Sequence, residues 1–346
     1  MRPLFHPGLV NGRYGDPAIY IERMFEKHSL LFDIGDITTL APRKIHQIDR
    51  IFVSHAHIDH FIGFDHLLRL LVGRDKTVQL FGPSGFAERV YHKLQAYRWN
   101  LVDNYPSDLT FVVSEIETQQ FLSTTRFRLK GGFAAEPLVA KRRVDGVVCN
   151  DPAYRVSVAI LDHRTPCLGF ALQETAHVNI WKNRLVERRL PVGPWLRALK
   201  QAVTEGRGDD HLISVGESSG PVERRVPLGS LRNLLTVTAG QKIAYVTDAT
   251  DTPANRARIV ALARDADILF IEAAFAAADA SLAERRAHLT TTAAGEIARQ
   301  ANVRRVEPFH FSPRYAGEEP RMLAEVTEAF RGSRGRVAHP DAGDVP

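Results

Sequence analysis

Residues 54–60 read Ser-His-Ala-His-Ile-Asp-His and carry the strongest chemical signal in the chain. His55, His57, Asp59 and His60 place three imidazoles and one carboxylate within six residues, which is hard to explain as a core or as a random surface. Imidazole and carboxylate suit Zn²⁺, and two neighbouring ions can share a bridging hydroxide. We therefore predict that this segment binds one or two metal ions. The alternative is an exposed histidine-rich loop.

The metal-binding turn needs a scaffold, and the pattern around it indicates a sheet. It follows the strand-like segment 50–53 and precedes a helical pattern. Similar apolar runs of the β type recur along the chain, separated by turns and by helical patterns, and Pro83, Pro253 and Pro320 fit helix starts. We therefore predict an α/β fold with helices outside a sheet. The expected strands are 18–21, 30–32, 51–53, 78–81, 109–113, 156–161, 243–246 and 268–271, and the expected helices are 61–72, 85–97, 194–204, 253–263, 291–300 and 320–330.

Length and composition exclude several protein classes. The 346 residues include 44% hydrophobic residues, 45 Lys and Arg, and 40 Asp and Glu, which is ordinary for a globular chain and unlike a disordered or collagenous one. Cys149 and Cys167 are too few for a disulfide framework, so we expect a reducing compartment. No apolar run reaches the roughly 18 residues of a membrane helix, and no signal-peptide pattern opens the chain. We expect a cytoplasmic protein that does not bind membranes.

The formal net charge of +5 is concentrated in one segment. Residues 182–207 hold seven Lys or Arg against two Glu, whereas the rest of the chain is balanced. Such a run is usually a solvated helix face, and it can equally be a surface for phosphates. Charge alone leaves both readings open. The polar stretch 206–227 is expected to form a loop or arm, and the tail after Phe330 to be frayed.

The motif His55-x-His57-x-Asp59-His60 resembles the H-x-H-x-D-H signature of the metallo-β-lactamase superfamily. The resemblance implies an αβ/βα four-layer sandwich with a dinuclear metal site at the sheet edge, and further ligands at strand ends. His163, Asp248 and His310 each follow a strand-like run in the expected order. Asp33 resembles the first motif of the superfamily, whose role is to support the metal loop.

Three features are similar to one branch of that superfamily, ribonuclease Z, the tRNA 3′-processing endonuclease. The segment 310–315, His-Phe-Ser-Pro-Arg-Tyr, resembles the H-x-S-x-R-Y ending of the family. The segment 287–290, Ala-His-Leu-Thr, precedes an alanine-rich helix and resembles its H-S-T-x-x-x-A segment. Gly193 and Pro194 lie in the basic segment, where the family carries a Gly-Pro-containing arm that grips tRNA.

Some positions depart from the family pattern. Ile58 stands where ribonuclease Z has Gly, Leu289 where it has Ser, and Thr247-Asp248-Ala249 where it has Gly-Asp-Thr. The segment around Asp33 lacks the common Gly-Glu-Gly continuation. These departures indicate a divergent subgroup, yet they remove no candidate ligand.

The resemblance assigns a role to each candidate residue. His55, His57 and His163 would hold one Zn²⁺, Asp59, His60 and His310 the other, and Asp248 would bridge them, with Mn²⁺ or Fe²⁺ as alternatives. A metal-bridging hydroxide would attack the phosphodiester, and Asp59 would orient or deprotonate that water. His288 would protonate the leaving 3′-oxygen, with Glu272 as a candidate to orient it. The expected substrate-binding residues are Ser312, Arg314, Arg184, Arg188, Gly193, Pro194, Arg197 and Lys200.

These assignments predict a catalytic domain over 1–330, an inserted tRNA-binding arm over 178–228 and a flexible tail over 331–346. The expected partner is precursor tRNA, and the resemblance implies a homodimer with two ions per subunit. One alternative is a hydrolase of the same fold that acts on small phosphodiesters or other esters. A second alternative is a nucleic-acid-binding scaffold with an inactive metal site.

Overall fold

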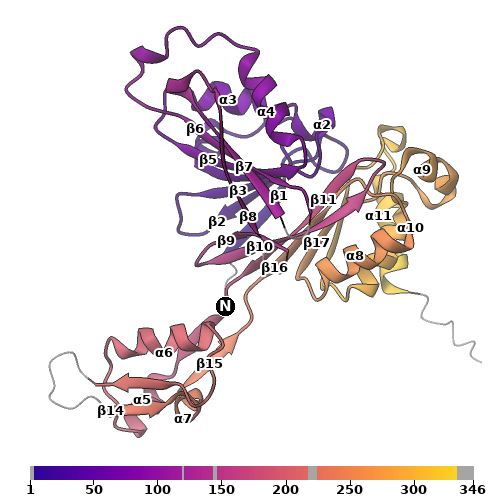
Figure 1. The fold of residues 1–346 in the computed structure, drawn as a ribbon. Helices are drawn as coiled ribbons and strands as arrows, with labels where there is room; N and C mark the ends of the chain where they lie inside the picture. The colour runs from indigo at the N-terminus through magenta and orange to yellow at the C-terminus, as the bar shows by residue number, and fades with distance from the viewer. Residues whose placement is uncertain (1–3, 119–120, 143–145, 217–223, 333–346) are drawn as a thin grey trace, which may run out of the picture. The chain divides into compact units, whose positions relative to one another are not determined.

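The computed structural model describes residues 4–118, 121–142, 146–216 and 224–332. The chain divides into two compact units (Figure 1). The main unit comprises Met1–Asn150, Val156–Leu172 and Lys242–Pro346. The inserted unit comprises Asp151–Arg155 and Gln173–Gln241. Most of the tail predicted from residue 331 onward, namely 333–346, lies outside the described residues.

The main unit contains two sheets. The first has eight strands in sequential order, and its central strands β3 to β6 run parallel. Its strands are β1 (Phe5–Leu9), β2 (Ile19–Arg23), β3 (Ser29–Phe32), β4 (Ile48–Phe52), β5 (Thr77–Pro83), β6 (Thr110–Ile116), β7 (Phe121–Arg128) and β8 (Ala135–Arg142). The second sheet has the order β18-β17-β16-β11-β10-β9, with β16 to β18 parallel. Its strands are β9 (Val147–Asn150), β10 (Tyr154–Asp162), β11 (Pro166–Glu174), β16 (Lys242–Val246), β17 (Ile268–Glu272) and β18 (Val306–Phe309).

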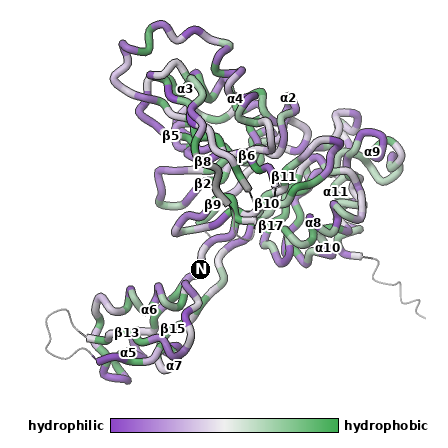
Figure 2. Tube along the Cα trace, in the orientation of Figure 1, coloured by the Kyte–Doolittle hydropathy of each residue, from purple (hydrophilic) through white to green (hydrophobic). Residues whose placement is uncertain are grey.

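The two sheets pack face to face through aromatic side chains. Phe32 on β3 lies 5.7 Å from Phe170 on β11 and 5.6 Å from Tyr245 on β16, measured between ring centroids. All three rings are buried. Apolar residues dominate β10, β11 and β17 (Figure 2), as expected for strands that are covered on both faces.

Helices cover the outer face of each sheet, which completes four layers (Figure 1). Ile45, Leu67 and Val90, from three different helices on the first side, belong to one core cluster with the first sheet. Ile259, Ile297 and Met322 belong to a second cluster with the other sheet. The first side carries α1 (Pro42–Gln47), α2 (Ile58–Phe61), α3 (Phe64–Leu71) and α4 (Phe86–Gln95), and the second α8 (Pro253–Ala263), α9 (Ala280–Arg286), α10 (Thr291–Gln300) and α11 (Glu319–Arg331).

The expected strands and helices of the main unit are present, with two corrections. Pro83 ends β5 instead of starting a helix, and α4 begins at Phe86. The helix predicted over 61–72 is divided into α2 and α3 at Gly63. A Cβ on Gly63 would lie 2.1 Å from the carbonyl oxygen of Gly35, so only glycine lets the two loops approach this closely. This contact packs the loop after β3 against the metal-binding turn.

The inserted unit has a small core of its own. Leu185, Trp195 and Leu199 are buried together with Ile213 and Val215. The stretch 206–227, which we expected to be a loop or arm, contains two strands. In the first of them Ile213 and Val215 alternate inward between exposed neighbours. The elements are β12 (His177–Ile180), α5 (Lys182–Glu187), α6 (Trp195–Thr204), β13 (Leu212–Val215), β14 (Arg224–Pro227), α7 (Leu228–Leu231) and β15 (Leu235–Thr238).

Among the helices of the described residues, none combines the length and the apolar character that crossing a bilayer requires.

Candidate metal centre

All seven candidate ligands lie in the main unit, at or just after strand ends. The turn with His55 and His57 follows β4, and Asp59 and His60 lie on α2. His163 follows β10, Asp248 follows β16 and His310 follows β18. Because β16 and β18 run parallel with β17 between them, Asp248 and His310 meet at the same sheet edge as Glu272, the last residue of β17. Asp248 and His310 have positive φ angles of 33° and 59°, a conformation that costs non-glycine residues free energy and is enriched at active sites.

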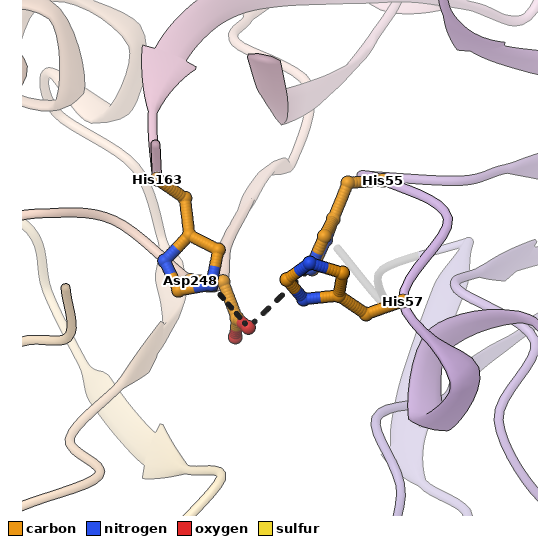
Figure 3. A group of neighbouring side chains, drawn as sticks. All are labelled: His55, His57, His163 and Asp248. Atoms are coloured by element: carbon orange, nitrogen blue, oxygen red, sulfur yellow. Dashed lines mark ion pairs between the residues drawn. The ribbon is translucent and has the colours of Figure 1, made fainter. Parts of the chain in front are cut away.

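The first group of side chains consists of His55, His57, His163 and Asp248 (Figure 3). One potential ligand atom from each lies within 4.8 Å of the others. The Nε2 atoms of His55 and His163 lie 3.5 and 3.4 Å from the same oxygen of Asp248, Oδ2. The imidazoles come from the two different sheets and turn toward one carboxylate (Figure 3).

The second group consists of Asp59, His60 and His310, again within 4.8 Å of one another. His60 Nε2 lies 3.4 Å from Asp59 Oδ2, and His310 Nε2 lies 3.2 Å from the same oxygen. Asp248 reaches this group as well, since its Oδ2 is 3.5 Å from His60 Nε2 and its Oδ1 is 3.2 Å from His310 Nδ1. The Asp248 carboxylate therefore lies between the two groups, as a bridging ligand requires.

The donor set fits cations. Within the cluster, three buried imidazole nitrogens have no hydrogen-bond partner among the described residues: His55 Nε2, His60 Nε2 and His310 Nδ1. In His55 and His60 the other nitrogen is anchored: Nδ1 of His60 lies 2.8 Å from Asp33, and Nδ1 of His55 lies 3.1 Å from Ser54 Oγ. His163 Nδ1 is held in the same way, 2.8 Å from the carbonyl oxygen of Ala287. Anchoring one ring nitrogen while the other faces the site is the usual arrangement of metal-binding histidines.

Asp33 supports the metal-binding turn from behind. Its fully buried carboxylate accepts hydrogen bonds from the Ser54 amide at 2.6 Å, the Ser54 hydroxyl at 2.7 Å and the Tyr245 hydroxyl at 2.5 Å, besides its contact with His60. Sequence reasoning anticipated a supporting Asp33 but missed Ser54 and Tyr245. Both are ordinary residues by type, and only the packing of the two sheets shows that Tyr245 reaches Asp33.

The electrostatics of the cluster favour the ligand forms of several side chains. Burial lowers the pKa of His55 to about 2, which keeps this imidazole neutral. Burial would raise the pKa of Asp59, but hydrogen bonds from His310 and His60 hold it below its ordinary value. Burial acts on Asp248 in the same way, and the imidazoles of His310 and His60 keep its pKa well below the usual range. Both carboxylates are therefore ionised at neutral pH.

His288 lies beside the cluster and is held by Glu272. It sits in the loop between α9 and α10, and its ring centroid is 4.9 Å from that of His163. Its Nδ1 is 2.9 Å from Oε2 of Glu272, whose other oxygen accepts a hydrogen bond from the Ala249 amide at 2.6 Å. Burial would lower the pKa of His288, but the charge and hydrogen bond of Glu272 raise it to about 9. This geometry suits a protonated histidine that presents Nε2 to a substrate.

Ser312 and Arg314 line a pocket next to His288. Phe275, Leu282 and Arg286 complete its lining, and its volume is about 300 Å³. Arg314 lies 3.9 Å from Asp279, a loose pair between two exposed side chains. Sequence reasoning missed Phe275, Leu282 and Arg286, because nothing in the local pattern indicates that α9 faces the loop after β18.

The Lys and Arg side chains of the inserted unit that we predicted to bind substrate fall into two sets. Arg184 donates to the carbonyl oxygen of Asn233, and Arg188 donates to that of Ser230 at 2.5 Å, so both hold α5 to the segment 230–233. Arg197 and Lys200 on α6 have no ion pair within the described part of the chain. They line a hollow of about 480 Å³ together with Lys182 and the apolar residues Ile180, Leu185, Val192 and Leu196.

Gly193 and Pro194 shape the start of α6. Pro194 is the residue before the first turn, and the Trp195 indole donates to the carbonyl oxygen of Pro191 at 2.8 Å. A Cβ on Gly193 would lie 3.1 Å from the carbonyl oxygen of Gly216. These contacts fix the local backbone, and a direct contact of Gly193 or Pro194 with substrate stays a prediction.

The chain resembles known proteins in sequence and in fold. A model of the β-lactamase superfamily domain matches residues 36–179. Ribonuclease Z of Deinococcus radiodurans is 33% identical over 305 residues, which cover 87% of each chain. Ribonuclease BN of Cronobacter sakazakii is 29% identical over 314 residues, covering 88% of this chain and 85% of the relative. The metallo-beta-lactamase fold protein YhfI from Bacillus subtilis superposes with a TM-score of 0.52 at 15% identity, over 94% of this chain and 92% of the other. The predicted metallo-β-lactamase fold is confirmed.

Proposed function

Since this chain belongs to the ribonuclease Z family, we propose that it is a metal-dependent endoribonuclease that hydrolyses one phosphodiester at the 3′ end of precursor tRNA. The observation that carries the proposal is the convergence of two ligand groups on Asp248 beside an oriented His288. This constellation has the three parts that phosphodiester hydrolysis needs: cation ligands, a carboxylate near the nucleophile and an acid for the leaving group.

The proposed cofactor is a pair of zinc ions. His55, His57 and His163 would hold one ion, Asp59, His60 and His310 the other, and Asp248 would contact both. When bound, two divalent cations make water a nucleophile near neutral pH and stabilise the charge on the phosphate oxygens. The preference for zinc over Mn²⁺ or Fe²⁺ rests on the predominance of imidazole in the donor set.

The chain's own residues would move the protons. In this family the cut leaves a 3′-hydroxyl on the tRNA and a 5′-phosphate on the trailer, so the departing group is the tRNA 3′-oxygen. A water oxygen bonds to phosphorus while the bond from phosphorus to that 3′-oxygen breaks. His288 Nε2 gives its proton to the 3′-oxygen, and Glu272 holds Nδ1 and stabilises the charged ring. The Asp59 carboxylate, which is 36% exposed, would orient the water and accept its proton.

The inserted unit is proposed to bind the body of the tRNA. Lys182, Arg197 and Lys200 are the proposed phosphate contacts, because they line one hollow and no ion pair among the described residues neutralises them. The family resemblance further suggests a homodimer, in which the arm of one subunit serves the other. We place the protein in the cytoplasm as part of the same proposal, and no disulfide joins its two cysteines.

Cleavage of two substrates by the zinc-loaded protein tests the proposal. We expect endonucleolytic cleavage of a precursor tRNA carrying a 3′ trailer, and slower hydrolysis of bis(p-nitrophenyl) phosphate. Zinc content is measured in parallel, with Asp248→Asn as the variant that loses metal. Hydrolysis of the small diester alone would favour a general phosphodiesterase. A protein without bound metal and without either activity would favour an inactive scaffold.

A further inference from the structure

The pocket beside His288 adjoins the metal centre, and the proposed chemistry does not yet assign any part of the substrate to it. Its volume of about 300 Å³ is at the lower end of the range for small-molecule sites, which runs from about 300 to 1,000 Å³. A group of the size of one nucleotide therefore suits it better than a duplex. The lining combines a phenylalanine and a leucine with two arginines, a serine and the imidazole of His288.

The polar side chains of the pocket are available to a ligand. Arg286 is exposed at the end of α9, and within the described residues it has no recorded hydrogen bond or ion pair. Arg314 pairs loosely with Asp279, at 3.9 Å, and its guanidinium lies 5.9 Å from the centre of the Tyr315 ring. Guanidinium groups bind phosphate oxygens through paired hydrogen bonds, so two arginines in one hollow favour an anion.

The apolar side of the pocket suits a base. Phe275 is 7% exposed and lies 6.0 Å from His288 between ring centroids, while Leu282 is partly buried beside it. Bases in single strands commonly pack against such rings without sequence preference. The lining of this one hollow thus offers contacts both for a phosphate and for a base.

The position of His288 gives the strand direction. Under the proposed function, this residue protonates the 3′-oxygen that leaves, and that oxygen belongs to the nucleotide on the 5′ side of the cut. His288 lines this pocket and also joins Asp248 and His310 in the cluster. The nucleotide that carries the leaving oxygen must therefore lie against His288, on the pocket's side of the metal centre.

We propose that this pocket holds the last nucleotide of the mature tRNA, with its base on Phe275 and Leu282 and its 5′-phosphate on Arg286 and Arg314. The proposal rests on the proposed function and adds the polarity of the RNA across the site. It also assigns a substrate contact to Arg286. The pocket would thereby distinguish the complete product from an RNA that is shorter by one nucleotide, because the shorter RNA leaves the pocket empty.

Binding of two product RNAs tests this assignment without any cleavage step. One RNA is the mature tRNA that ends in a 3′-hydroxyl at the cut, and the other lacks its last nucleotide. We expect the zinc-loaded protein to bind the complete product about tenfold more tightly, the factor expected for a charged hydrogen-bonded contact. Arg286→Ala should prefer the complete product by a clearly smaller factor, because only Arg314 and the apolar contacts remain, and Arg286→Lys should recover part of the lost preference.

Arg285→Ala is the matched control, because Arg285 precedes Arg286 on α9, is exposed and does not line the pocket. It should discriminate like the unaltered protein. If Arg286→Ala prefers the complete product by the same factor as the unaltered protein, the proposal is overturned. Selective loss of affinity for a 5′-phosphorylated trailer in Arg286→Ala would overturn it too, because the pocket would then hold the nucleotide on the other side of the cut. Absence of precursor cleavage by the unaltered protein would instead count against the proposed function.

Discussion

Replacing Asp33 by alanine should destabilise the protein and weaken metal binding at the same time. The Asp33 carboxylate is fully buried and lies within 2.8 Å of the Ser54 amide, the Ser54 hydroxyl, the Tyr245 hydroxyl and His60 Nδ1. In Asp33→Ala these four buried groups lose their acceptor together. Ser54 lies next to His55, and His60 is itself a candidate ligand, so the loss reaches both ligand groups.

The magnitude follows from the number of groups left without a partner. Each unsatisfied buried donor costs about 1–3 kcal/mol, and the four costs are not additive because they share one carboxylate. Breaking a buried charged pair costs about 3–5 kcal/mol, which we take as the expected loss in unfolding free energy. The Tyr245→Phe variant removes a single donor and should lose about 1 kcal/mol. Zinc affinity should fall by about 10- to 100-fold in Asp33→Ala, as for other residues that orient a metal ligand.

Urea unfolding of the metal-free proteins and calorimetric zinc titration measure the two effects. Asp36→Ala is the control, because Asp36 lies three residues further on and is exposed. Its carboxylate accepts hydrogen bonds from the Thr38 amide at 2.8 Å and the Thr38 hydroxyl at 2.6 Å. This variant should lose less than about 1 kcal/mol and keep its zinc affinity. If Asp33→Ala matches Asp36→Ala in both measurements, the supporting role derived for Asp33 is refuted.

Three further predictions concern catalysis, RNA binding and metal. His288→Ala should slow precursor cleavage by about 10²- to 10⁴-fold and Glu272→Gln by a smaller factor, both with unchanged zinc content in a metal assay; loss of zinc would mean that the pair is structural. In the double variant Arg197→Ala, Lys200→Ala, the slope of log binding constant against log salt concentration for precursor tRNA should be shallower by about one to two, while bis(p-nitrophenyl) phosphate is hydrolysed normally. Arg184→Ala should instead lower the melting temperature of the inserted unit. An unchanged salt slope in the double variant would show that α6 does not contact the RNA. Zinc at a hundredfold excess over its dissociation constant should raise the unfolding free energy by about 2.7 kcal/mol, which a chelator reverses; an identical thermal transition with and without zinc would contradict the cluster's fit to cations.

The metal-binding turn was predictable from sequence because its chemistry is local. Four of the candidate ligands lie within six consecutive residues, so their spacing alone brings their side chains together: His55, His57, Asp59 and His60. Asp248 and His310 are different, because each is a lone polar residue after a strand and becomes meaningful only when parallel strands place them at one edge. The family resemblance supplied that order before the sheets were known.

Contacts across the sandwich were beyond the reach of sequence patterns. Tyr245 reads as an apolar strand residue, yet its hydroxyl crosses to Asp33, more than two hundred positions away. The same limit applies to charge. The sequence shows the excess of positive charge on residues 182–207, but it does not show that the guanidinium groups of Arg184 and Arg188 donate to backbone carbonyl oxygens. The proposed RNA contacts are consequently Lys182 on α5 and Arg197 and Lys200 on α6. The structure also shows that deleting this segment would remove the buried Leu185, Trp195 and Leu199, so point variants are the better test.

Mapping both ends produced from one precursor tRNA tests the central claim most directly. The zinc-loaded protein is incubated with a precursor labelled at each end, and the termini of the two fragments are determined. We expect a single cut after the last nucleotide of the mature 3′ end, with a 3′-hydroxyl on the tRNA and an intact trailer that begins with a 5′-phosphate. A ladder of shortened trailers, a 3′-phosphate on the tRNA, or no cleavage in the presence of bound zinc would contradict the account.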